Sequence, residues 1–263
     1  MSMPFYVPPE QWTKEKADYA RKGIARGRPL LVLEYADGIV FVTENPSTHL
    51  HKVSELYDRI AFAAVGRFSE FESLRQAGVR LADIRGYAYG REDVTGRSIA
   101  NTYSQALGQV FMQENKAYEV ELCVAEVGTD GAPNALYHVI YDGTFVEPKG
   151  YLAMGGEAEA LNVDLQRSYR DGMTLEEAVH LAVRTLRRGA PAGSEASSRL
   201  EVAVLDRHRS RRLFRRLSDE EVAAVIAGGE AKDTSGGEAK DTSGAAASPS
   251  TGSDGTTPPA GST

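Results

Sequence analysis

Apolar and polar residues near the start of the chain form short runs separated by turn signals. Two runs of mostly apolar residues, 30–36 and 38–44, meet at Asp37-Gly38, a dipeptide typical of tight β-hairpins. The segment Glu10–Arg26 has no interior proline and follows Pro8-Pro9, which favours a helix that begins just after the prolines. The pattern predicts a helix followed by two antiparallel strands.

Strands and helix pairs alternate along the rest of the chain. Further strands are predicted around residues 50–56, 59–66, 118–128, 135–143, 151–156, 200–206 and 211–217. A helix pair follows residue 66, another follows residue 156 with a capping box from Thr174 to Glu177, and a short helix begins at Ser218. Hairpins favour antiparallel sheets, and each helix pair can cover one outer sheet face. The predicted fold class is therefore α+β, a four-layer αββα sandwich with two antiparallel sheets between helix layers.

A change of composition near Gly228 divides the chain. Residues 228–263 are rich in Gly, Ser, Thr, Ala and Pro, lack aromatic and large aliphatic residues, and contain the octad GEAKDTSG twice in tandem. Such a segment buries too little apolar surface to offset the entropy of ordering. We expect a disordered low-complexity tail over 228–263, in which a slipped duplication is favoured over an interaction motif. The folded domain is predicted over 10–227, preceded by a separate segment, 1–9.

Composition excludes several classes of function. The 263 residues carry a formal net charge of −7, which argues against a general nucleic-acid binder. The single cysteine, Cys123, excludes an internal disulfide and fits a reducing compartment. No apolar run approaches the ~20 residues that span a bilayer, and the N-terminus does not read as a secretory signal. We expect a cytoplasmic protein with no membrane and no nucleic-acid partner.

The search for chemistry yields few candidates. There is no G-x-S-x-G motif, and Cys123 lies in an apolar strand pattern typical of a core residue. His49 and His51 are two residues apart in a predicted strand and could share a face, but no third metal ligand is near them. We therefore expect neither a metal nor a cofactor.

Three other features each allow two interpretations. Gly155-Gly156 could cradle a phosphate but fits tight strand-to-helix packing better, because the dinucleotide and P-loop fingerprints are missing. The basic run Arg207–Arg216 fits a solvated hairpin, with Leu213 and Phe214 turned inward, better than a nucleic-acid contact. Lys52 could blunt a sheet edge or present a cation to a carboxylate, and the sequence leaves these two alternatives open.

The segments YARKGIARG, LYDRIAFAAVG and YEVELCVAEVG occur in this order, and with the element layout they resemble the proteasome alpha subunits, above all the actinobacterial branch. The resemblance covers residues 5–227. It implies the four-layer fold of the N-terminal nucleophile hydrolases. It places Arg28 where the related beta subunits carry their nucleophilic threonine, Glu44 near their structural aspartate and Lys52 on their lysine. Because Arg28 has no hydroxyl and lies 27 residues into the chain, and Pro29 lacks a backbone donor, we expect a non-catalytic subunit.

The resemblance also implies a role. Alpha subunits form heptameric outer rings that stack on beta-subunit rings, and their N-terminal segments close the pore through which unfolded protein substrates pass. The implied gate residues here are Met3, Phe5, Tyr6, Val7, Pro8 and Pro9. Ring-shaped ATPase regulators dock their C-terminal tails between neighbouring alpha subunits, and the implied pocket residues are Lys52, Gly27 and Arg26. The implied context is degradation of proteins tagged with a small ubiquitin-like modifier, Pup. Two alternatives stay open: an active hydrolase of the same fold, and a stand-alone soluble binding module.

Overall fold

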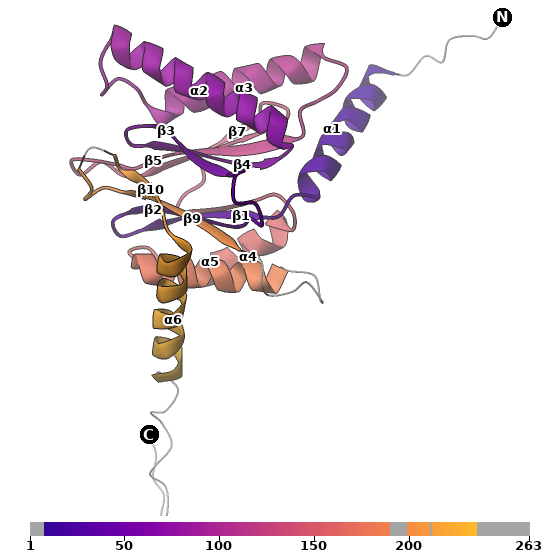
Figure 1. The fold of residues 1–263 in the computed structure, drawn as a ribbon. Coiled ribbons are helices and arrows are strands. Elements are labelled where there is room, and N and C mark those ends of the chain that lie inside the picture. Colours follow the sequence, from indigo (N-terminus) through magenta and orange to yellow (C-terminus); the bar gives the residue numbers. More distant parts are fainter. Residues whose placement is uncertain (1–7, 190–198, 211, 236–263) are drawn as a thin grey trace, which may run out of the picture.

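In the computed structural model, which describes residues 8–189, 199–210 and 212–235, two five-stranded antiparallel sheets pack face to face (Figure 1). The first sheet has the order β10 (Phe214–Arg216), β9 (Leu200–Asp206), β2 (Gly38–Glu44), β1 (Leu30–Tyr35) and β8 (Tyr151–Met154). The second has the order β3 (Val53–Tyr57), β4 (Ile60–Gly66), β5 (Val120–Glu126), β6 (Ala135–Ile140) and β7 (Phe145–Val146).

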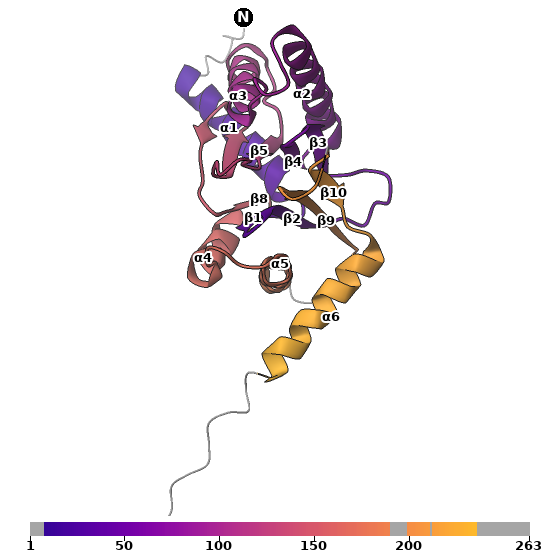
Figure 2. The ribbon, with the colours of Figure 1, turned by 90° about the vertical axis from the view of Figure 1, so that its left-hand side faces the viewer.

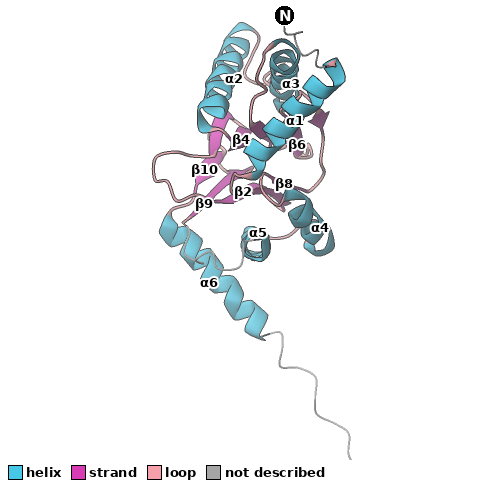
Figure 3. Cartoon of the chain, turned by 90° about the vertical axis from the view of Figure 1, so that its right-hand side faces the viewer, coloured by secondary structure: helices cyan, strands magenta, loops and turns pink. Residues whose placement is uncertain are grey.

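Helices cover both outer faces of the paired sheets (Figure 1). The second sheet is covered by α2 (Phe68–Ala88) and α3 (Gly96–Gln113), and the first by α4 (Ala158–Ser168) and α5 (Leu175–Gly189). The first helix, α1 (Pro9–Ala25), crosses the side of the sandwich from the level of α3 to that of β8 (Figure 3). The last, α6 (Asp219–Ser235), packs on α5 and extends away from the body (Figure 2). The predicted four-layer fold is confirmed.

Strand β1 shows why its sequence is apolar at successive positions. Leu30 and Val32 face the core between the sheets, whereas Leu31 and Leu33 face the helices that cover the first sheet. All four side chains are fully buried. A strand buried on both faces has no polar side to alternate with, so its sequence reads as one hydrophobic run.

Several predicted boundaries differ from the structure. The first helix spans 9–25 and not 10–26, β10 has three residues where 211–217 was predicted, and β7 was not predicted. The last helix was predicted to be short, but α6 has 17 residues and passes the predicted boundary at 228. Residues 236–263 lie outside the described part of the chain, so a disordered tail stays a prediction for them. Residues 1–7 of the predicted gate, including Met3, Phe5, Tyr6 and Val7, also lie outside it.

The predicted strand over 50–56 begins three residues late, at Val53. The preceding residues form a loop because side chains there bind the backbone: the Asn45 amide oxygen accepts from the Ser47 N–H at 3.0 Å, and the Ser47 hydroxyl accepts from the Leu50 N–H at 2.9 Å. Such local bonds compete with strand pairing. His49 and His51 therefore lie in a loop, and the prediction that they share a strand face was wrong.

Candidate functional site

Lys52 ends the loop between β2 and β3, and its side chain points toward the start of β1. Its Nζ donates hydrogen bonds to the carbonyl oxygen of Arg28 at 2.8 Å and to the Thr43 hydroxyl at 3.2 Å. The Thr43 hydroxyl in turn donates to the Pro29 carbonyl at 2.7 Å. Lys52 thus reaches across to the β1–β2 hairpin and does not lie along the edge of β3. Of the two interpretations of this lysine, the inward-directed cation fits the geometry.

The structure brings together the three residues that the resemblance placed on the catalytic positions of beta subunits. Arg28 precedes β1, and its guanidinium lies 3.1 Å from the Glu44 carboxylate while its carbonyl holds Lys52. The Arg28 nitrogen is bonded to Gly27, so it offers no free amine to act as a base, and its side chain is no nucleophile. The Thr43 hydroxyl beside Lys52 is fully buried and engaged with a carbonyl. This arrangement supports a silent active-site position.

The charge state of Lys52 depends on its surroundings. The pKa of Lys52 is lowered to about 8, chiefly by burial and in part by the nearby Arg28 cation, although the Glu201 and Glu44 carboxylates act in the opposite direction. Desolvation disfavours the charged form of an amine, and nearby anions favour it. The ammonium is therefore largely protonated at neutral pH, but it loses its proton at a much lower pH than an exposed lysine does.

The other two predicted pocket residues lie where α1 ends. Arg26 is exposed and caps the C-terminus of α1. The Gly27 carbonyl accepts from the Gly156 N–H at 3.1 Å, and a Cβ on Gly156 would lie 2.8 Å from that oxygen and 2.9 Å from the Ala25 carbonyl oxygen. The Gly155-Gly156 pair therefore serves tight packing, as predicted, and it fixes the exit of α1 next to Arg28.

Two residues of this site were missed by sequence reasoning. Thr43 is a polar residue at a buried strand position, a signal that could have singled it out. Glu201 lies opposite Thr43 in the register of β9 with β2 and is also buried. Nothing in the sequence connects it to Lys52, since the two residues are far apart in the chain.

The remaining candidates have structural roles. Cys123 is buried in the core between the sheets, and burial raises the pKa of its thiol to about 12. Within the described residues, no group of three or more His, Cys, Asp or Glu side chains could hold a metal ion. His51 lies 3.4 Å from the Glu201 carboxylate.

Among the residues that the structure describes, no helix has the length and apolar character needed to cross a membrane.

The basic run forms the predicted hairpin of β9 and β10. Leu213 is buried, and Phe214 packs against the core between the sheets. Arg212 binds Glu55 and Arg215 binds Glu221, so these cations are paired with acids within the chain. The interpretation as a hairpin, and not as a nucleic-acid contact, fits these contacts.

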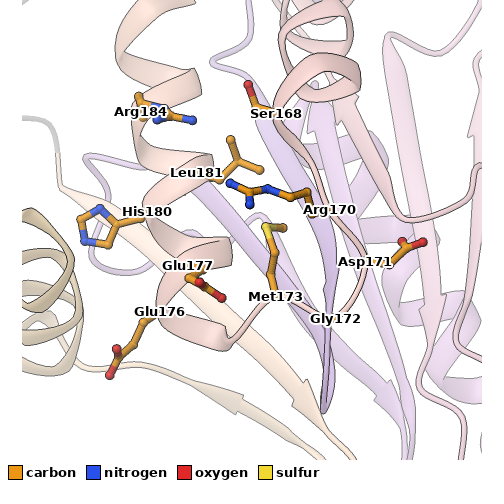
Figure 4. A pocket seen from close by; sticks show the side chains of 10 residues that line it. All are labelled: Ser168, Arg170, Asp171, Gly172, Met173, Glu176, Glu177, His180, Leu181 and Arg184. Atoms are coloured by element: carbon orange, nitrogen blue, oxygen red, sulfur yellow. The ribbon is translucent and has the colours of Figure 1, made fainter. Parts of the chain in front are cut away.

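A cavity of about 380 Å³ lies among the helices that cover the outer face of the first sheet, between the α4–α5 loop and α5 (Figure 4). Figure 4 shows Arg170, Glu177 and His180 around it, with none of the predicted site residues. Glu177 belongs to the predicted capping box, because its carboxylate accepts from the Thr174 N–H at 2.8 Å. The His180 ring lies 2.7 Å from the Ile226 carbonyl of α6. Glu177 and His180 thus serve helix capping and helix packing.

The fold and the site together define a class of protein. It is a four-layer sandwich of the nucleophile-hydrolase type in which Arg28, whose nitrogen lies in a peptide bond, occupies the nucleophile position. The family model described as "Proteasome subunit" matches residues 24–205. The chain belongs to this family.

Relatives specify the type of subunit. The chain is 54% identical to "Proteasome subunit alpha" of Saccharopolyspora erythraea over 88% of this chain and 90% of that protein. It is 55% identical to the protein of the same name from Kineococcus radiotolerans, over 87% and 99% of the two chains, and 57% identical to that of Xylanimonas cellulosilytica, over 82% and 93%. The chain is of the alpha type: such subunits form outer rings of the 20S core, assemble with beta subunits and are non-catalytic. The predicted resemblance and the absence of catalysis are confirmed.

Proposed function

We propose that this chain forms a heptameric outer ring in which residues 1–9 gate the pore and a pocket at Lys52, Gly27 and Arg26 docks the C-terminal tails of a ring-shaped ATPase. Unfolded protein substrates pass the gate on their way to the beta-subunit chamber. The observation that carries the docking role is the Lys52 ammonium, which is held at the Arg28 carbonyl where α1 joins β1.

The chemistry of this position suits a terminal carboxylate. An ammonium binds a carboxylate through a charge-assisted hydrogen bond, which is stronger than a neutral one but modest for a single tail. Several tails on one regulator engage several subunits of a ring, and effective concentration then makes the combined binding strong. The pocket therefore favours a ring-shaped partner over a single peptide.

The position also connects docking to the gate. Helix α1 has 17 residues, which corresponds to a length of about 25 Å. Its C-terminus meets Gly27 beside the pocket, and its N-terminus carries the predicted gate, of which Pro8 and Pro9 enter the helix. A tail bound at one end of this helix can thus shift the segment at the other end. Given the actinobacterial resemblance, the proposed setting is the cytoplasmic degradation of Pup-tagged proteins.

The proposal is tested with particles assembled from this chain and its beta subunit. Lys52→Ala is expected to abolish the stimulation of peptide hydrolysis by a synthetic C-terminal tail peptide or by the ATPase, while basal hydrolysis and particle mass stay at wild-type values. Lys149→Ala, which removes an exposed lysine between β7 and β8, is the matched control. Stimulation that survives in Lys52→Ala would refute the pocket assignment.

A further inference from the structure

Glu201 is a buried carboxylate at the place where the two sheets meet. It lies on β9 of the first sheet, and its side chain is 5% exposed. In the register of β9 with β2 it is opposite Thr43, whose hydroxyl accepts the bond from the Lys52 ammonium. A buried carboxylate is costly unless donors surround it, so its partners indicate what it is for.

Its partners are concentrated in the loop that carries Lys52. One carboxylate oxygen accepts from the Asn45 side-chain amide at 2.7 Å and from the Lys52 backbone N–H at 3.1 Å. The other accepts from the Val53 N–H at 3.3 Å. Glu201 thus binds both the first residue after β2 and the residues that enter β3.

This loop crosses from the first sheet to the second, so neither sheet alone fixes its path. Without Glu201, the backbone N–H groups of Lys52 and Val53 would lose these acceptors, and Val53 is fully buried. Unpaired donors in such a place are unfavourable, and the loop would rearrange to satisfy them. The direction of the Lys52 side chain depends on that backbone.

We infer that Glu201 is a positioning residue for tail docking, which orients Lys52 by holding its backbone and supplies the negative charge that balances its ammonium. The inference rests on the proposed docking role of Lys52. The inference adds Glu201, on β9, to the residues on which docking depends, and Glu201 is not one of the predicted pocket residues.

The charges around Glu201 and Lys52 support the second part of this inference, the balance of charge. His51 and Arg216 lie 3.4 and 3.5 Å from one carboxylate oxygen, and the other oxygen accepts from the Lys52 backbone N–H. The ion-paired Arg28 and Glu44 also act on the ammonium, in opposite directions. Glu201 and Glu44 are the two acids that favour the charged form of Lys52, so removal of the Glu201 charge lowers the pKa of Lys52.

The test is Glu201→Gln in the assembled particle, since glutamine keeps the shape but removes the charge and places an N–H against at least one backbone donor. Glu34→Gln is the matched control, because Glu34 on β1 also holds a loop, through the Gly150 N–H at 2.9 Å. We expect the tail-peptide concentration for half-maximal stimulation to rise about tenfold in Glu201→Gln and to stay unchanged in Glu34→Gln.

A second readout does not depend on docking. Acylation of Lys52 by an amine-reactive reagent, followed by peptide mass spectrometry across a pH series, reports when its amine loses its proton. In Glu201→Gln this profile is expected to shift to lower pH. If the variant does not assemble, Asn45→Ala loosens the same loop while it keeps the carboxylate, and a smaller increase in the half-maximal concentration is expected.

The outcomes separate this inference from the proposed function. Loss of stimulation in Lys52→Ala, with wild-type stimulation and a wild-type labelling profile in Glu201→Gln, overturns the role of Glu201 and leaves the docking proposal intact. Wild-type stimulation in Lys52→Ala refutes docking itself, and the labelling profile then decides whether Glu201 positions Lys52.

Discussion

The Lys16 ammonium lies 2.6 Å from the Glu114 carbonyl oxygen, so a cation in the middle of α1 caps the C-terminus of α3. It also donates to the Phe111 carbonyl and lies 5.2 Å from the centre of the Phe111 ring. The last carbonyls of a helix lack intrahelical partners and carry partial negative charge, which favours a cation. The helix that leads to the predicted gate is thereby fastened to the layer that covers the second sheet.

We predict that Lys16→Met loosens α1 without unfolding the domain. The loss of these charge-assisted bonds should destabilise the docked helix by about 1–3 kcal/mol. Amide hydrogen exchange of α1 in the assembled particle measures this directly. Lys14→Met, at an exposed position of the same helix, is the control. Equal protection of α1 in both variants would show that Lys16 does not fasten the helix.

The second prediction concerns Gly156, where the chain passes close to the end of α1. An alanine Cβ would lie 2.8 Å from the Gly27 carbonyl oxygen, so the backbone must shift. We expect Gly156→Ala to cost about 1–3 kcal/mol in thermal or denaturant unfolding. In Gly228→Ala the added methyl meets nothing within 4 Å, and that helical position should be neutral or slightly stabilised. Equal stability of the two variants would contradict the close approach.

The sequence predicts the layers of this fold well because its strongest signals are local. The Asp37-Gly38 hairpin and the capping box at Thr174 depend on neighbours within a few residues, and both occur in the structure. The site is different, because Lys52 is held by Thr43 on β2 and Glu201 on β9 of the other sheet, and by Arg28 just before β1. The resemblance placed Lys52 and Arg28 but not the two residues that orient the lysine. Which distant polar residue meets which is decided by the packing of the sheets, and no local pattern encodes it.

The third prediction tests the gate. Deletion of residues 2–8 removes the apolar residues Met3, Phe5, Tyr6 and Val7, together with Pro8, ahead of α1. If they close the pore, the assembled core should hydrolyse a small peptide severalfold faster without a regulator, because diffusion through the pore then limits the rate less. The comparison is made at equal particle concentration, with beta-subunit activity checked by an active-site label. An unchanged rate would refute the gate assignment.

The fourth prediction concerns the silent active-site position. Arg28→Thr places a hydroxyl beside Lys52, yet the nitrogen of residue 28 stays in a peptide bond with Gly27. A threonine nucleophile of this class uses its own free amine as base. We therefore expect the variant to keep its full mass and to hydrolyse no peptide in the absence of beta subunits. Chain cleavage before residue 28, detected by mass spectrometry together with new activity, would show that the fold still processes itself.

The last prediction follows from the pKa of Lys52, which burial lowers to about 8. A tail carboxylate binds the ammonium and not the neutral amine, so docking is strong below this pKa and weakens as pH rises through it. Above the pKa, the affinity for a synthetic tail peptide should fall about tenfold for each pH unit. The measurement is the half-maximal stimulating concentration from about pH 7 to about pH 9, with beta-subunit activity recorded at each pH without peptide.

Lys52→Arg separates this titration from other effects of pH. A guanidinium stays protonated over the whole range, so any docking that the variant retains should lose the pH dependence. Because arginine is longer and planar, the variant can dock more weakly at every pH, and this result is compatible with the assignment. A docking affinity that falls with rising pH as steeply as in the wild type contradicts it. Such a decline would mean that another group controls docking, and His51 is an unsuitable alternative because its pKa is lowered, chiefly by burial, to below its ordinary value of 6.5. An equal loss of docking affinity in the wild type and in Lys52→Arg above about pH 8 would therefore refute the assignment of Lys52 as the cation that binds the tail.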